Sequence, residues 1–172
     1  MLFWLSLNHV QAQKFTEYDL KAAYLFNFAK FVQWPEYAFE DDDAPYVLGI
    51  YGEDPFGSIL INALRGNTVK GRSWVIKYFT RIEDIDCHIL FLSGIEEHEM
   101  KKIIEFTSDK PILTVGDHLE YFCEQGGMIN FTRQYARHRF EINNEAALKS
   151  KIYISSKLLV LAKIVSKDEV KF

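Results

Sequence analysis

The chain has 172 residues, of which 48% are hydrophobic and 15% are aromatic, and its formal net charge is -4. This length and composition suit one domain with a sizeable core and exclude an intrinsically disordered protein. The mild acidity, without any long basic run, argues against nucleic acid as the main partner.

The first twelve residues differ from the rest of the chain. Residues 1–7 are apolar (MLFWLSL), and residues 10–12 (VQA) have the small-residue spacing that a signal peptidase reads. We therefore predict a signal peptide that is cleaved near Ala12, and export to the periplasm of a two-membrane bacterium. The alternative is an apolar N-terminal strand. No other segment approaches the roughly 20 apolar residues of a membrane span, so we expect no span after cleavage.

Helices and strands alternate along the first two thirds of the chain. Thr16 is a suitable N-cap for a first helix, and Pro35 ends that helix because the residue before a proline avoids the α region. The predicted apolar face of the helix repeats at helical spacing and comprises Leu20, Ala23, Tyr24, Phe28 and Phe31. Strands are predicted at 46–51, 72–80, 88–92 and 111–115, and helices from Pro55 onward and at 96–106. The run at 88–92 is almost continuously apolar, which is typical of a strand covered on both faces.

The last third predicts a β-hairpin between short helices. Apolar and polar residues alternate at 128–132 and 137–143, which favours a half-buried antiparallel pair. A short helix is predicted from Gly116 through Phe122, before the hairpin. After it we expect a helical turn at 144–149, a strand at 151–154 and a last helix, capped by Ser155 or Ser156, that carries Leu158, Leu159, Leu161, Ala162 and Val165.

Strands that alternate with helices predict an α/β fold. We expect a single layered domain over residues 16–166, with a mostly parallel sheet flanked by helices and an antiparallel hairpin near the C-terminal third. Residues 167–172 form a charged tail.

Three arginines, Arg133, Arg137 and Arg139, cluster at the hairpin turn of this acidic chain. A guanidinium group offers a planar fork to carboxylates and phosphates, and it also stacks on aromatic rings. One interpretation is a solvated hairpin tip, and the other is a surface that faces a binding partner.

The sequence contains no constellation that is typical of catalysis or of a metal site. Asp86, Cys87 and His88 are adjacent on a strand and point alternately to opposite faces, so they cannot all bind one ion. The other histidines do not have ligand spacing. Neither a GxSxG elbow nor a GxGxxG or Walker pattern occurs, and the glycines at 49–57 are expected to be turn glycines. We predict no enzyme, no metal and no cofactor.

The two cysteines, Cys87 and Cys123, allow two arrangements. In an oxidising compartment they could form a disulfide, which would stabilise the fold by about 4 kcal/mol in the chain-entropy model. The alternative is two separate buried thiols.

Six blocks of the sequence, taken in order, resemble the YfiR-like family. They are KAAYLFNFAKF with WP (21–35), DPFG (54–57), CHILF (87–91), LTVGD (113–117), GGMINF with RFEIN (126–143) and ISSKLL (154–159). The resemblance covers most of the chain, from about Tyr18 to Val165. No single block is specific, and the order of all six is what makes the match strong.

The resemblance implies an exported, non-enzymatic regulator. It would bind the sensory domain of an inner-membrane diguanylate cyclase, repress cyclic-di-GMP synthesis and form a homodimer. Better-known members resemble this chain at both cysteines and carry further cysteines in bridges linked to redox control. This chain lacks those extra cysteines, which puts the redox switch in doubt.

The sequence leaves two alternative functions open. One is a periplasmic sensor partner of a histidine kinase or a transport receptor. The other is a small-molecule or nucleotide-binding domain, which the strand–turn–helix pattern at 49–57 suggests.

Overall fold

The computed structural model describes residues 16–133 and 139–166. The predicted signal peptide, the charged tail and Arg137 lie outside the described residues. The helices are α1 (Glu17–Phe31), η1 (Glu36–Ala38), α2 (Ser58–Leu64), η2 (Ile82–Asp84), α3 (Glu97–Thr107), α4 (Asn144–Lys149) and α5 (Ser156–Leu159). The strands are β1 (Val32–Gln33), β2 (Tyr46–Gly52), β3 (Trp74–Phe79), β4 (Ile89–Ser93), β5 (Leu113–Asp117), β6 (Ile129–Phe131), β7 (Phe140–Ile142), β8 (Tyr153–Ile154) and β9 (Lys163–Ile164).

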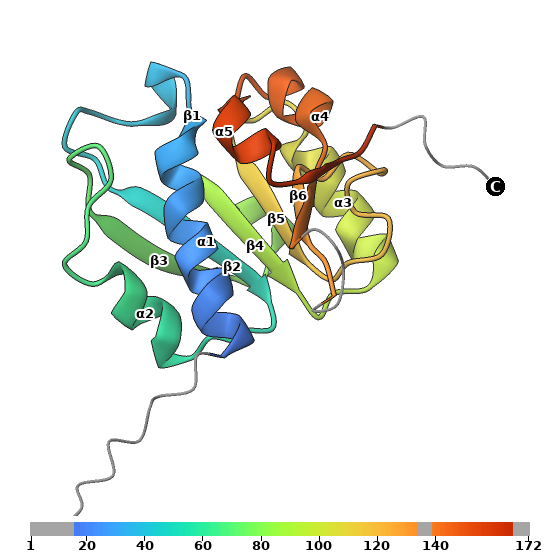
Figure 1. Cartoon of the computed structure of the whole chain (residues 1–172), viewed down its shortest axis with the longest axis horizontal. Coiled ribbons are helices and arrows are strands. Elements are labelled where there is room, and N and C mark those ends of the chain that lie inside the picture. The colour runs from blue at the N-terminus through green and yellow to red at the C-terminus, as the bar shows by residue number, and fades with distance from the viewer. Residues whose placement is uncertain (1–15, 134–138, 167–172) are drawn as a thin grey trace, which may run out of the picture.

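The centre of the fold is a seven-stranded sheet in the order β3-β2-β4-β5-β6-β7-β9 (Figure 1). The strands β3, β2, β4, β5 and β6 are parallel to one another, β7 is antiparallel to β6, and β9 is parallel to β7. A separate two-stranded antiparallel sheet joins β1 to β8 and sets Val32 opposite Ile154. The predicted α/β class, with a mostly parallel sheet, is confirmed.

Alternate residues of the central strands pack into two cores, one on each face of the sheet. In β4, Ile89 and Phe91 belong to the core that includes α1 and α2, whereas Leu90 and Leu92 belong to the core that includes α3. Figure 1 shows α1, α2 and α5 on one face and α3 on the other. All five residues of β4 are buried, which confirms the prediction of a strand covered on both faces.

Helix α1 begins as predicted but differs in its end and its buried face. The Thr16 side chain accepts a hydrogen bond from the Asp19 amide, and the Asp19 carboxylate accepts one from the Thr16 amide. The helix ends at Phe31 rather than at Pro35, because the next two residues pair with β8. Of the five residues of the predicted apolar face, only Phe28 is buried. The buried residues are Lys21, Ala22, Leu25, Phe28 and Ala29.

Three other boundary predictions are wrong. The helix predicted from Pro55 begins at Ser58, because residues 54–57 form a turn in which the Asp54 side chain accepts from a backbone amide. Residues 116–117 complete β5 and do not start a helix. The last helix stops at Leu159, and the chain returns to the sheet as β9.

The predicted hairpin is present but is more buried than expected. Strands β6 and β7 pair antiparallel, with Asn130 opposite Glu141. All three residues of β6 are buried, so the hairpin is not half-buried. It also lies within the sheet, because β9 adds to the free side of β7.

Candidate functional site

Three parallel strands end at one edge of the sheet in residues that face the start of α1. Ser93, Asp117 and Phe131 are the last residues of β4, β5 and β6. The first turns of α1 bring Glu17 and Lys21 to the same edge. In open α/β sheets, ligands bind outside the carboxyl ends of the strands. This edge is therefore the expected location of a functional site.

A buried ion pair joins α1 to this edge. Lys21 Nζ lies 2.6 Å from Asp117 Oδ1, and the two side chains are only 5% and 3% exposed. The ammonium group also lies 2.5 Å from Glu17 Oε1 and 3.0 Å from His118 Nε2. Its three N–H bonds are thus matched by three polar neighbours. We call these four residues the Lys21 cluster.

Two hydroxyl groups complete the surroundings of the Asp117 carboxylate. Tyr18 Oη donates to Asp117 Oδ2 at 3.3 Å, and Ser93 Oγ donates to the same oxygen at 3.5 Å. Burial, followed by the charge of Asp117, raises the pKa of Tyr18 to about 12. The hydrogen bond from Lys21, followed by the contact with His118, lowers the pKa of Glu17. Ser93 is buried and contacts a carboxylate rather than an imidazole, so the cluster does not form a nucleophilic triad.

The Lys21 cluster also contains three groups with metal-ligand chemistry. Glu17, Asp117 and His118 each offer one donor atom, and these atoms lie within 4.8 Å of one another. The Lys21 ammonium group contacts those same three residues, so it occupies the position that a metal ion would take. In this chain the arrangement is an ion-pair cluster in which the Lys21 ammonium group is the cation. The sequence does not reveal this cluster, because Lys21 and Asp117 are 96 residues apart.

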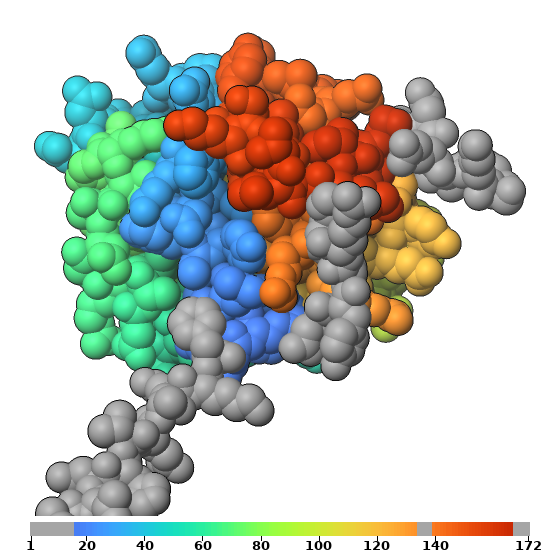
Figure 2. Space-filling view, in the orientation of Figure 1, coloured from blue at the N-terminus to red at the C-terminus, as the bar shows by residue number. Residues whose placement is uncertain are grey.

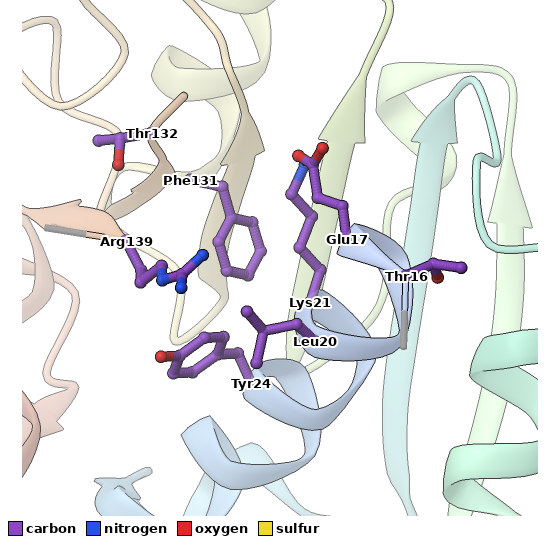
Figure 3. Close-up of a pocket in the computed structure, with 8 residues that line it drawn as sticks. All are labelled: Thr16, Glu17, Leu20, Lys21, Tyr24, Phe131, Thr132 and Arg139. Carbon is purple, nitrogen blue, oxygen red and sulfur yellow. The ribbon is translucent and has the colours of Figure 1, made fainter. Parts of the chain in front are cut away.

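A pocket of about 210 Å³ lies beside the Lys21 cluster, between α1 and the β6–β7 pair. Figure 3 shows the guanidinium group of Arg139 pointing toward Phe131 and Tyr24. The residues that line this α1–hairpin pocket are Thr16, Glu17, Leu20, Lys21, Tyr24, Phe131, Thr132 and Arg139.

The structure separates the predicted arginine group. Arg133 is exposed, Arg139 is exposed and lines the α1–hairpin pocket, and Arg137 lies outside the described residues. A partner-facing role for the three arginines stays a prediction.

The two cysteines are free thiols in the core beneath α3. Cys87 is 8% exposed and Cys123 is fully buried. Burial raises the pKa of Cys87 to about 12 and that of Cys123 well above its ordinary value. Because the thiolate is the reactive species, both side chains are unreactive in this state. The Cys87–Cys123 bridge stays a prediction that thiol counting tests.

A second feature of the surface is the exposed apolar segment, residues 148–164. Five of the ten large hydrophobic side chains that are exposed in the described part of the chain lie in it, with exposures from 46% to 76%. Figure 2 shows α5 and the residues after it on the face turned toward the viewer, beside α1. The five residues are Leu148, Tyr153, Val160, Leu161 and Ile164. Contiguous apolar patches mark interaction surfaces, so this segment is a candidate for one.

A protein-family model described as YfiR/HmsC-like matches residues 18–163. The chain belongs to the YfiR/HmsC-like family. Members of this family are in general periplasmic regulators of diguanylate cyclases. The match includes most of the Lys21 cluster and nearly all of the exposed apolar segment. No curated protein matches the chain at a significant level.

Within the described residues of this YfiR/HmsC-like chain, we find no helix with the length and apolar character needed to cross a membrane.

Proposed function

We propose that this protein is an exported, non-enzymatic regulator that binds the sensory domain of an inner-membrane diguanylate cyclase and represses cyclic-di-GMP synthesis. The observation that carries the proposal is the family match over residues 18–163. The apolar sequence at 1–7, followed by VQA, supports export to the periplasm. Repression would follow if the protein binds the inactive conformation of the cyclase better than the active one, since differential affinity shifts the population.

We propose the exposed apolar segment as the surface that contacts the cyclase. Val160 is 76% exposed and Leu161 is 58% exposed, and both follow the short helix α5. Burying such side chains against a partner contributes roughly 1.5–3 kcal/mol each. The segment is held to the rest of the fold by the Ser155 amide, which donates to the Phe31 carbonyl at 2.8 Å, and by the pairing of β9 with β7. A second copy of the chain, as in the implied homodimer, is the competing occupant.

The proposal is tested by capture from membranes with the mature protein and a matched pair of variants. Leu161 and Tyr121 are almost equally exposed, at 58% and 57%, on different segments. We expect wild type and Tyr121→Asp to capture a membrane cyclase and Leu161→Asp to lose it, with equal melting temperatures. Size-exclusion chromatography of the same variants shows whether Leu161→Asp instead dissociates a homodimer into monomers. Capture of the cyclase by Leu161→Asp at wild-type strength would reject this surface.

The arginine turn is the second candidate surface. Because the Arg139 side chain points toward the α1–hairpin pocket, the test uses its neighbours in sequence. If the turn contacts the cyclase, Arg137→Glu abolishes repression and leaves the melting temperature nearly unchanged, and Arg133→Glu has the same effect. Unaltered repression in both variants rejects the turn.

The identity of the captured protein also decides between related functions. Capture of a histidine kinase or a transport receptor, in place of a cyclase, would support the regulatory role but assign it a different target.

The nucleotide alternative at 49–57 loses support from the geometry. A Cβ atom added at Gly94 would lie 3.0 Å from Glu53 Oε2, so a carboxylate lies beside the residue that follows β4. A phosphate group placed there would be repelled.

A further inference from the structure

The α1–hairpin pocket contains a cation, Arg139, that pairs with no carboxylate of the described residues. Arg139 lines the pocket and points into it (Figure 3). In the described part of the chain, carboxylates form ion pairs with Lys21, Arg81, Lys101, His118 and Lys163, but not with Arg139. The charge of the Arg139 guanidinium group is therefore available to a ligand.

The other cation on the pocket wall is already neutralised. The Lys21 ammonium group lies between the carboxylates of Glu17 and Asp117, at 2.5 Å and 2.6 Å. Glu17 lines the same pocket, and its side chain is 37% exposed. One positive charge and one partly exposed negative charge therefore face the same space. The Glu17 charge disfavours a ligand with two negative charges, such as phosphate, and leaves the Arg139 guanidinium group as the positive group that a ligand could pair with.

Apart from Thr16 and Thr132, the rest of the wall is apolar. Leu20, Tyr24 and Phe131 line the pocket, and the rings of Tyr24 and Phe131 are 6.1 Å apart at an angle of 51°. The volume of about 210 Å³ equals that of about seven water molecules. It is smaller than the roughly 300–1,000 Å³ of pockets for drug-sized molecules. The pocket thus selects a small ligand with a short apolar body.

We propose that the α1–hairpin pocket binds a small monocarboxylic acid with an apolar body. The planar carboxylate pairs with the guanidinium fork of Arg139. The apolar body packs against Leu20, Tyr24 and Phe131, at the edge of the sheet where ligands of α/β folds bind. This binding site does not depend on the proposed contact with a cyclase.

The test uses phenylacetate as the probe, in calorimetry and thermal-shift titrations. A ligand that binds the folded state raises the melting temperature as its concentration rises above the Kd. Acetate lacks the apolar body, 2-phenylethanol lacks the charge, and inorganic phosphate carries excess charge. We expect phenylacetate to bind and to stabilise the protein more than any of these three.

Variants locate the binding site. Arg139→Gln removes the charge, and we expect phenylacetate to bind about tenfold to a hundredfold more weakly. Arg65→Gln, an exposed arginine that does not line this pocket, is the matched control and keeps wild-type affinity. Arg139→Lys keeps the positive charge but lacks the planar guanidinium group, so its affinity for phenylacetate should lie between those of the wild type and Arg139→Gln.

Three results would overturn the proposal. One is the absence of any phenylacetate binding to the wild type. Another is equal affinity of wild type and Arg139→Gln, and the last is tighter binding of phosphate than of phenylacetate.

Discussion

Removal of the Lys21 ammonium group tests whether the buried ion pair stabilises the fold. Lys21→Met keeps an unbranched side chain but leaves the Asp117 carboxylate, which is 3% exposed, without its cation. Breaking a buried pair by removing one partner costs about 3–5 kcal/mol. For a domain of this size we expect the melting temperature to fall by about 6–20 °C.

The chain provides a matched control for this variant. On α3, Lys101 pairs with Glu97 at the same i,i+4 spacing as Lys21 and Glu17 on α1. Lys101 Nζ lies 2.6 Å from Glu97 Oε1, but both side chains are more than half exposed. Lys101→Met is therefore expected to cost less than about 1 kcal/mol. A double variant, Lys21→Met with Asp117→Leu, removes both buried charges and regains part of the loss. The measurement is urea unfolding of all four proteins near neutral pH. Equal losses in Lys21→Met and Lys101→Met would refute the reasoning.

Three further predictions concern single groups in the cores. Burial lowers the pKa of His88, whose Nδ1 accepts a hydrogen bond from the Val47 amide. The unfolded chain therefore takes up the proton first, and the free energy of unfolding should fall as the pH drops below about 6.5. The expected slope is up to about 1.4 kcal/mol per pH unit. Urea unfolding at several pH values should show no such slope for His88→Gln, whereas His98→Gln, an exposed control, should keep it. Equal slopes in the two variants would contradict the assignment of this pH dependence to His88. In Gly127→Ala the new Cβ would collide with the Phe122 ring and should cost about 1–3 kcal/mol in urea unfolding, whereas no loss would mean that the ring moves away freely. Thiol counting with a coloured disulfide reagent should find no reactive cysteine in the native protein and two in the denatured, unreduced protein; no free thiols after denaturation would establish the Cys87–Cys123 bridge.

Features set by neighbouring residues could be predicted from the sequence. The start of α1 is one, because the reciprocal hydrogen bonds of Thr16 and Asp19 are local. The two-sided burial of β4 is another, because an apolar run without alternation has no polar face to expose.

The buried face of α1 could not be predicted in the same way. The helix has apolar residues around most of its circumference, so helical spacing fits several faces. Lys21 lies four residues before Leu25 and seven before Phe28, which is the buried stripe. A lysine in such a stripe is rare without a partner, and the partner, Asp117, comes from a strand that only the sheet register brings close.

The C-terminal errors have a similar cause. Apolar residues after Ser155 fit a helix, but pairing with β7 ends that helix early and forms β9. Residues predicted to lie on one helix are therefore divided: Leu158 and Val165 are buried, whereas Leu161 is exposed. Periodicity predicts which residues share a face, and it does not show whether the protein itself covers that face.

The central claim, repression of a membrane cyclase by direct binding, is tested most directly by its effect on catalysis. The measurement is cyclic-di-GMP synthesis by the captured cyclase in proteoliposomes, with the mature protein added to the side that carries the sensory domain. We predict that synthesis falls as the protein is added, that Tyr121→Asp acts like the wild type, and that Leu161→Asp has no effect. Synthesis that remains constant at saturating wild-type protein would contradict the account.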